Sequence, residues 1–164
     1  MFDFIKKFIS PFLASGTHLL PPGASHDFFS RCIRCGQCVA ACQYHSILFE
    51  SPNAILKTGT PYIDPSISPC YLTMACVKVC PTGALQNIDK KSVRMAHVSI
   101  DKDRCVAYKK VICRFCFNNC PLKGEAIIID RIEPIIIQEK CTGCGICHYV
   151  CPVKPNAVII KPLF

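Results

Sequence analysis

Fifteen cysteines among 164 residues carry the chemistry that this sequence offers, and all of them fall into four short runs. The last run is the most regular, with Cys141, Cys144, Cys147 and Cys151 followed by Pro152. Three thiolates at intervals of three residues converge on one four-iron cluster, and the fourth thiolate of such a run ligates a different cluster. Structural zinc instead uses paired cysteine knuckles set far apart. The spacing therefore predicts an iron–sulfur site.

Three further runs repeat the pattern with departures. The first run is regular in its cysteines, which are Cys32, Cys35, Cys38 and Cys42, and Gln43 replaces the proline. The second run keeps three cysteines, with Thr73 where another belongs: Cys70, Cys76 and Cys80. The third run carries a seven-residue insert after its first cysteine, and its members are Cys105, Cys113, Cys116 and Cys120. Four runs predict four clusters.

Short apolar segments bounded by turn residues separate the runs and indicate strands. The expected strands cover residues 47–49, 54–57, 62–63, 84–88, 93–100, 126–130, 134–138 and 157–161. Because 13 prolines and 8 glycines interrupt the chain, we expect no long helix. The sequence thus predicts a loop-rich α+β fold of two ferredoxin-like modules, tandem or nested, in which paired runs exchange their fourth cysteines.

Two pairings of the runs satisfy this exchange. Sequential pairing joins the first run with the second and the third with the fourth. Nested pairing joins the first with the fourth and the second with the third. We favour nested pairing, because it matches the two regular runs with each other and the two irregular runs with each other.

The net charge and the absence of certain motifs exclude several classes of function. The formal net charge of +8 treats every thiol as neutral, whereas four ligated four-iron clusters would add about −8. No Lys/Arg run exceeds two residues, so a nucleic-acid partner is not expected. The sequence contains no dinucleotide fingerprint, P-loop or convincing nucleophile–base pair. We therefore expect an electron-transfer subunit with no catalytic site of its own.

The N-terminal region differs from the rest of the chain. On a helix over residues 2–10, apolar side chains fall on one side, with Lys6 and Lys7 away from it. Residues 1–13 would dock on a membrane surface or an integral partner, or pack on the protein itself. Residues 14–28 contain Pro21-Pro22-Gly23 and predict a linker. The expected division is therefore 1–28 as an amphipathic segment with linker, and 29–164 as a four-cluster domain.

The chain resembles the ferredoxin-type NapG/MauM family from about Ala14 onward. The likeness rests on the runs themselves, on Cys80-Pro81-Thr82-Gly83-Ala84 and on the gap between Cys105 and Cys113. It implies an electron carrier with four [4Fe–4S] clusters. Its implied partners are an integral membrane iron–sulfur subunit that oxidises quinol and a periplasmic reductase or other terminal oxidoreductase or cytochrome.

Location follows from the same resemblance. Family members usually carry a twin-arginine export signal, and this sequence has none. We therefore expect membrane association on the cytoplasmic side, with co-export to the periplasm alongside a partner as the alternative.

Thr73 leaves one cluster type open. The spacing of the second run also resembles the three-iron site of succinate dehydrogenase iron–sulfur subunits, where a non-cysteine residue occupies the middle position. Three outcomes follow: a [3Fe–4S] cluster, a [4Fe–4S] cluster with a Thr73 oxygen or water as ligand, or no cluster. Since three cysteines are retained, we expect three [4Fe–4S] clusters plus one of the first two.

The leading hypothesis is an electron-transfer subunit that passes single electrons through four clusters between a quinol-oxidising membrane partner and a terminal oxidoreductase. The alternative is a structural, assembly or redox-sensing module of a larger complex. An open corner at Thr73 would suit sensing, because a labile iron can leave and return.

Overall fold

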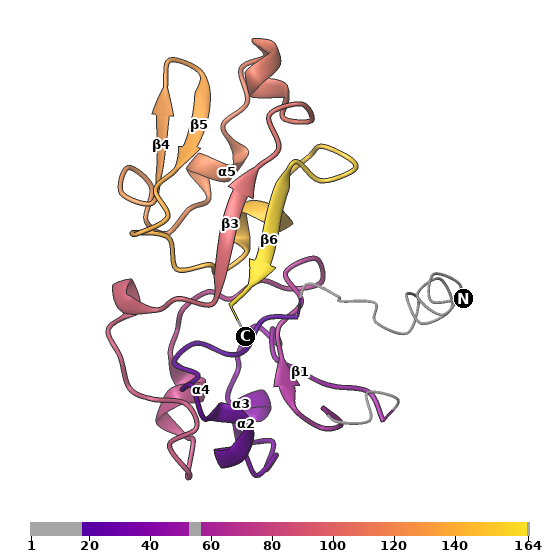
Figure 1. Cartoon of the computed structure of the whole chain (residues 1–164), viewed down its shortest axis with the longest axis vertical. Helices are drawn as coiled ribbons and strands as arrows, with labels where there is room; N and C mark the ends of the chain where they lie inside the picture. Colours follow the sequence, from indigo (N-terminus) through magenta and orange to yellow (C-terminus); the bar gives the residue numbers. More distant parts are fainter. Residues whose placement is uncertain (1–17, 53–56, 164) are drawn as a thin grey trace, which may run out of the picture.

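The computed structural model describes residues 18–52 and 57–163. Two modules follow one another along the long axis, the first over residues 18–93 and the second over residues 94–163 (Figure 1). Each α-helix in these ranges is a single turn of four residues: α2 (Phe28–Arg31), α3 (Gln37–Ala40), α4 (Ala75–Lys78), α5 (Phe115–Asn118) and α6 (Ile146–Tyr149). Two 3₁₀ turns join them, η1 (Lys90–Ser92) and η2 (Val106–Lys109). The expectation of short helices is confirmed for these residues.

Both modules follow one antiparallel plan. A hairpin stands between the two runs of each module: β1 (Leu48–Phe49) with β2 (Pro61–Tyr62), and β4 (Ile127–Asp130) with β5 (Glu133–Ile136). The chain before the first run of a module then pairs with the chain after its second run. In the second module this pair is β3 (Ala96–Ile100) with β6 (Val158–Pro162), and in the first it is a single bridge between Ala24 and Leu85.

The expected strands were placed well in the second module and less well in the first. The hairpin of β4 and β5 turns at Arg131, which takes a positive φ of 56°. The expected strand at 84–88 is reduced to the bridge at Leu85. The segment 54–57 and the helix over 2–10 lie wholly or largely outside the described residues.

Residues 18–28, which the sequence analysis assigned to a linker, belong to the first module. Leu19 is fully buried and exchanges two backbone hydrogen bonds with Ile63, each 2.8 Å long. Pro21 and Pro22 are also fully buried. Gly23 has a φ of 80°, and a Cβ there would lie 2.4 Å from the carbonyl oxygen of Gln86. The boundary expected at residue 28 therefore does not hold for these residues.

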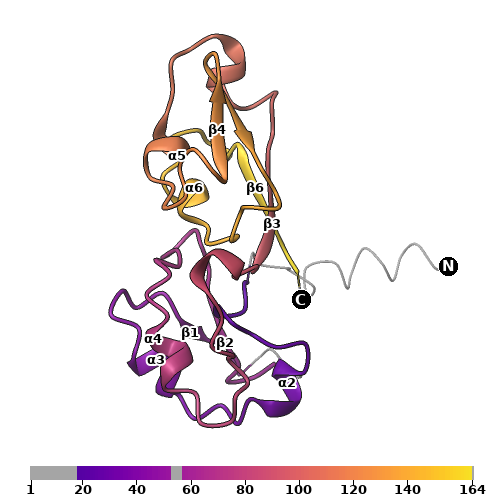
Figure 2. The same cartoon turned by 90° about the vertical axis from the view of Figure 1, so that its left-hand side faces the viewer.

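One continuous core runs through both modules. At the junction Val93, Met95 and Ala96 are buried, with exposed fractions of 0, 3 and 0 %. An ion pair at the rim joins the modules: Lys91 of the first module pairs with Glu125 of the second at 2.9 Å. Within the second module, the guanidinium of Arg94 donates to the carbonyl oxygen of Glu139. Seen from the side in Figure 2, the modules adjoin end to end. In the part of the chain that the structure describes, no helix is long and apolar enough to cross a membrane.

Candidate iron–sulfur sites

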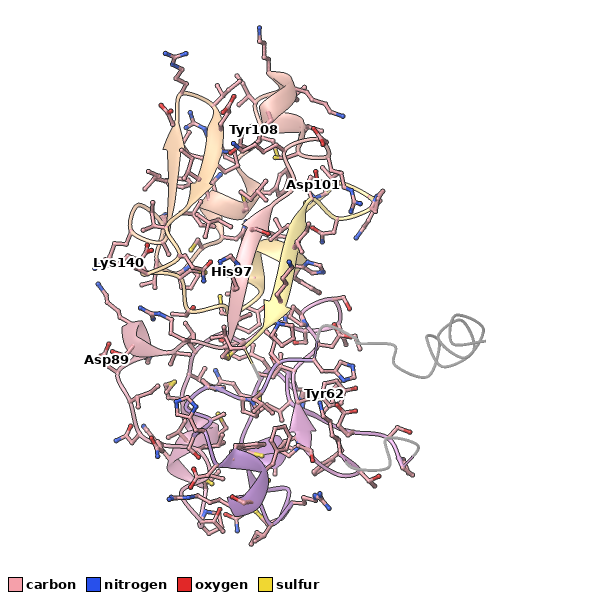
Figure 3. The ribbon with its side chains drawn as sticks, viewed as in Figure 1. Tyr62, Asp89, His97, Asp101, Tyr108 and Lys140 are labelled. Carbon is pink, nitrogen blue, oxygen red and sulfur yellow. The ribbon has the colours of Figure 1, made fainter. Side chains whose placement is uncertain are left out.

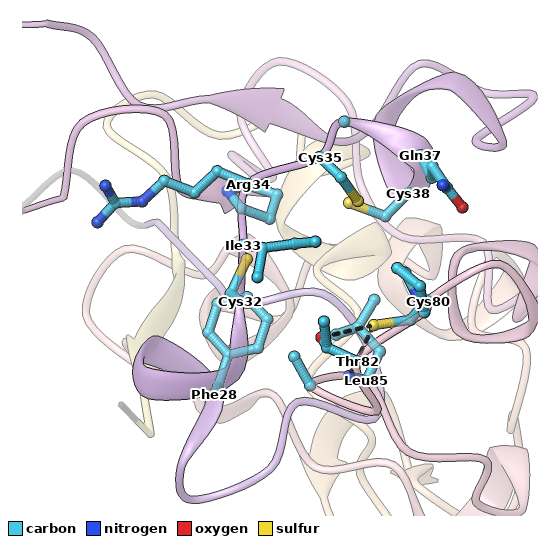
Figure 4. Close-up of a pocket in the computed structure, with 14 residues that line it drawn as sticks. Phe28, Cys32, Ile33, Arg34, Cys35, Gln37, Cys38, Cys80, Thr82 and Leu85 are labelled. Atoms are coloured by element: carbon cyan, nitrogen blue, oxygen red, sulfur yellow. Dashed lines mark hydrogen bonds between the residues drawn. The ribbon is translucent and has the colours of Figure 1, made fainter.

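Site 1 is a cavity where the first three thiols of the first run meet the last thiol of the second. Its cysteines are Cys32, Cys35, Cys38 and Cys80. Figure 4 shows these side chains around one space, with Arg34 pointing away from it. The turn of α3 carries Cys38 into the site, and the chain that follows α4 supplies Cys80. This is the crossed set of thiols that a ferredoxin-type cluster requires.

Site 2 has the reciprocal composition. Cys70 and Cys76 of the second run line a cavity with Cys42, the last cysteine of the first run, and Thr73 lines the same cavity. Thr73 is half-buried and stands where the corresponding cysteine stands in the other runs. Site 2 therefore offers three thiols and one hydroxyl.

The second module repeats the exchange. Site 3 gathers Cys105, Cys113, Cys116 and Cys151 around one cavity. Site 4 combines the last cysteine of the third run with three from the fourth. Burial and the nearby thiols of Cys144 and Cys141 raise the pKa of Cys120. Burial also raises the pKa of Cys147, together with the nearby thiols of Cys144, Cys141, Cys116 and Cys120. None of the fifteen cysteines forms a disulfide, and the four sites account for every one.

These sites show sequential pairing of the runs, so the nested pairing favoured from the sequence is wrong. Cys151 joins Cys116 in site 3 and does not join Cys35 in site 1. The physical reason is the hairpin between the runs of each module, which turns the chain back and sets α3 beside α4 and α5 beside α6 (Figures 1 and 2). The regular spacing of cysteines is a property of each run by itself and does not determine which other run it pairs with.

The loop of the second run keeps the backbone of a cluster-binding loop although it lacks the glycines. In the fourth run, Gly143 and Gly145 flank the second cysteine with φ values of 72° and 85°. In the second run, Leu72 and Met74 flank Thr73 with φ values of 54° and 60°. A non-glycine residue in this region costs about 1–2 kcal/mol. Retention of this strained shape favours a loop that still wraps a cluster, and these positive φ values could not be read from the sequence.

Burial makes the free thiols weak acids. It raises the pKa of Cys70 to about 12, and the pKa values of Cys38, Cys76, Cys116 and Cys120 to about 11. These groups are therefore neutral near pH 7 when nothing ligates them. Ligation requires the thiolates, so a metal centre that binds here must displace several protons and supply the compensating charge.

Hydrogen bonds to sulfur add residues that the sequence analysis did not single out. Burial alone would raise the pKa of Cys80, but bonds from the Leu85 N–H and from Thr82 outweigh it and lower that pKa (Figure 4). The Ser46 N–H donates to Cys42 Sγ at 3.4 Å. N–H···S bonds of this kind set the potential of a bound cluster. In the sequence, the one indication of these donors was the tight turn that follows each run.

The thiol sets fit clusters better than single ions. Within residues 18–52 and 57–163, no three His, Cys, Asp or Glu side chains lie close enough to hold one metal ion. Sulfurs around one zinc would be separated by about 3.8 Å, given Zn–S bonds of about 2.3 Å, whereas the corners of a cubane spread them wider. Sites 1, 2 and 3 each form a hollow lined by their own cysteines.

Sequential exchange predicts which pairs of cysteine variants remove the same cluster. Cys116→Ala and Cys151→Ala should each lower the iron content by about four atoms per chain, since each breaks site 3. The double variant Cys116→Ala/Cys151→Ala should lose no more than either single variant. The matched double variant Cys35→Ala/Cys151→Ala should lose about eight, because it breaks sites 1 and 3. Iron and sulfide analysis of anaerobically purified protein measures this, and nested pairing would reverse the two double-variant results.

Comparisons with known proteins agree with this geometry. Residues 31–84 match a family described as a 4Fe-4S dicluster domain, and residues 134–155 match one described as a 4Fe-4S binding domain. The dicluster match covers the first and second runs together, as sequential pairing requires. The chain thus contains two 4Fe-4S ferredoxin-type domains.

Curated relatives share most of this chain. The ferredoxin-type protein NapG of Escherichia coli K12 is 36% identical over 151 residues, which are 80% of this chain and 65% of NapG. The methylamine utilization ferredoxin-type protein MauM of Methylorubrum extorquens is 35% identical over 148 residues, 80% of this chain and 67% of MauM. MauM of Methylobacillus flagellatus is 37% identical over 147 residues, 80% of this chain and 62% of that protein. The chain spans about two thirds of the length of these relatives. It belongs to the NapG/MauM family of ferredoxin-type proteins.

Proposed function

We propose that this iron–sulfur electron-transfer protein holds four clusters and passes single electrons between a quinol-oxidising membrane subunit and a terminal oxidoreductase. The observation that carries the proposal is the division of all fifteen cysteines into four sites, each drawn from two runs. A bound cluster supplies reversible one-electron chemistry over a wide range of potentials. The family relationship supports electron transfer, and the specific partners are inferred from the resemblance.

The chain's own residues hold the clusters and shield them. Three cysteines of site 4, Cys141, Cys144 and Cys147, are each less than 9 % exposed, so bulk water is kept from that site. Cys35 of site 1 is exposed, so electrons can pass between that site and a partner at the surface. The formal charge of +8 offsets the negative charge that four thiolate-ligated clusters bring into the interior.

Site 2 is assigned either a [3Fe–4S] cluster or a [4Fe–4S] cluster with an oxygen ligand. Support for a cluster of some kind comes from the retained loop shape and from the buried thiols of Cys70 and Cys76. A three-iron cluster leaves the corner beside Thr73 empty. An oxygen-ligated four-iron cluster places the Thr73 hydroxyl or a water there.

A second candidate is redox or iron sensing by site 2. Thr73 is half-buried, so solvent can approach the corner that lacks a thiolate. A labile iron at this corner would leave on oxidation and return on reduction. In this case the clusters would shape a docking surface without passing electrons onward.

An anaerobic redox titration of the wild type and of Thr73→Cys, followed by EPR, tests both functions. The wild type should show reversible one-electron reductions of several clusters and, if site 2 holds three irons, a signal from that cluster in the oxidised protein. Thr73→Cys should abolish this signal and raise the iron content by about one atom per chain.

Of three further results, the first and the last contradict the proposal, and the second decides between the two clusters assigned to site 2. Iron loss on oxidation without fast, reversible reduction would favour sensing over electron transfer. A wild type without the three-iron signal, and with iron unchanged in Thr73→Cys, would assign the oxygen-ligated four-iron cluster to site 2. If neither protein held a cluster at site 2, the four-cluster proposal would be wrong.

A further inference from the structure

A backbone hydrogen bond joins cysteines of two different sites across the module junction. The N–H of Cys70, in site 2, donates to the carbonyl oxygen of Cys144, in site 4, at 3.0 Å. Both side chains are buried, with exposed fractions of 6 and 7 %. Sites 2 and 4 are therefore linked by one hydrogen bond and the few covalent bonds within each cysteine.

Close packing fixes this contact. A Cβ on Gly143 would lie 2.3 Å from the backbone nitrogen of Ala96, and a Cβ on Gly145 would lie 2.5 Å from Pro65. The Met95 N–H also donates to the Thr142 carbonyl oxygen at 2.9 Å. Gly145 is thus pressed against Pro65 of the first module, whereas Gly143 and Thr142 are held against residues 95 and 96 of their own module, and neither glycine has room for a side chain.

Within each module, paired helical turns place the other sites. Cys38 on α3 belongs to site 1 and Cys76 on α4 to site 2, and these turns pack side by side. In the same way α5 and α6 set site 3 beside site 4. Turn α2, next to site 1, lies near one end of the long axis (Figure 1).

We propose that the four sites form one row in the order 1–2–4–3, and that the Cys70–Cys144 contact is where electrons cross between the modules. This inference rests on the proposed function. In a crossing step site 2 is oxidised by one electron and site 4 reduced by one, or the reverse, and no atom is transferred. The electrons come from and go to the partner proteins named above. Site 2, beside Thr73, is thus an interior relay.

Pulsed EPR on reduced protein tests the order, because dipolar coupling between two reduced clusters falls steeply with their separation. In a Thr73→Cys background, Cys35→Ala/Cys116→Ala leaves sites 2 and 4, and Cys35→Ala/Cys147→Ala leaves sites 2 and 3. The first protein should show strong coupling after dithionite reduction, and the second should show markedly weaker coupling. Equal coupling, or stronger coupling in the second protein, would overturn the order.

A second pair of variants leaves all the cysteine ligands in place and changes only a glycine. Gly145→Ala must move the loop away from Pro65 of the first module, so coupling between sites 2 and 4 should weaken while the iron content stays unchanged. Gly124→Ala is the control, because Gly124 has a similar φ of 84° but no atom within 4 Å of an added Cβ. Unchanged coupling in Gly145→Ala would contradict the proposed crossing. Absence of any reducible cluster would instead contradict the proposed function.

A separate observation concerns the insert of the third run, at the opposite end of the molecule from α2 (Figure 1). The insert is anchored through Ala107, which is buried, and through Tyr108, which is labelled in Figure 3. The Tyr108 hydroxyl donates to the Pro134 carbonyl oxygen at 3.0 Å, and Lys102 lies over the Tyr108 ring. Beyond this anchor Val111 and Ile112 are 54 and 78 % exposed. Burying them would lower the free energy of a complex.

Basic residues flank this apolar surface in the sequence. Lys109, Lys110 and Arg114 are exposed, and no acidic residue occurs between Arg104 and Lys123 in the sequence. None of the three makes an ion pair with any residue that the structure describes. Phe115, 54 % exposed, lines the cavity of site 3, so a partner seated here would lie against that site.

We propose that the surface formed by Lys109–Ile112, Arg114 and Phe115 docks an acidic electron-transfer protein. Electron-transfer encounters bury less than about 1,200 Å² and are commonly weak, so a small patch suffices. Opposite charges on the two proteins would steer association and raise its rate about 10- to 1,000-fold at low ionic strength.

Stopped-flow electron exchange with plant-type [2Fe–2S] ferredoxin, used as the acidic probe, tests this surface. Lys109→Glu/Lys110→Glu should lower the second-order rate constant at least about tenfold at low ionic strength and flatten its dependence on salt. Lys57→Glu/Lys78→Glu, which makes the same change of charge in the first module, should have little effect. Equal losses in both variants, a loss only in the second, or no loss in either would overturn the proposal.

Discussion

Each site takes thiols from two runs, and this exchange is the interaction on which the rest of the structure depends. In the first module, the single turn of α3 lies between Cys35 and Cys42, so one helical turn connects site 1 to site 2. The turn of α4 makes the return connection through Cys76 and Cys80. A helix of four residues is not stable by itself. We therefore attribute the order of these turns to the cross-links that ligated thiols would provide at both ends.

The same exchange accounts for the thin core and the basic composition. The sheets have only two strands each, and such ribbons are marginal in water. Apolar packing continues through the junction at Val93 and Ala96, but several of the buried groups are cysteines. With thiol pKa values raised by burial, the chain without metal would bury neutral thiols in cavities. Metal–thiolate bonds would fill these cavities and cross-link the loops around them, which couples folding to cluster binding.

The sequence was most informative where a few residues determine local geometry. The spacing of cysteines identified the four loops whose thiols gather in the structure, and the hairpin at residues 126–138 followed from β-branched segments on either side of Arg131. The pairing of runs was predicted wrongly, because the similarity of two loops does not determine which loops meet in space. That choice depends on the short hairpins between neighbouring runs, and in the first module the paired strands are only two residues long.

Two other features could not be read from the sequence for physical reasons. The Pro21-Pro22-Gly23 segment has the composition of a linker, yet Leu19 pairs with Ile63 and the prolines are buried. Because proline has no backbone N–H, burying it leaves no donor without a partner. The positive φ values of Leu72 and Met74 were equally hidden, because neither residue favours that region.

All four sites, including the one beside Thr73, are proposed to hold clusters. Mössbauer spectroscopy with iron and sulfide analysis on fully reconstituted protein measures this most directly. Three [4Fe–4S] clusters plus one [3Fe–4S] cluster predict about 15 irons per chain, and an oxygen-ligated four-iron cluster at site 2 predicts about 16. Fewer than about 12 irons per chain would contradict the account.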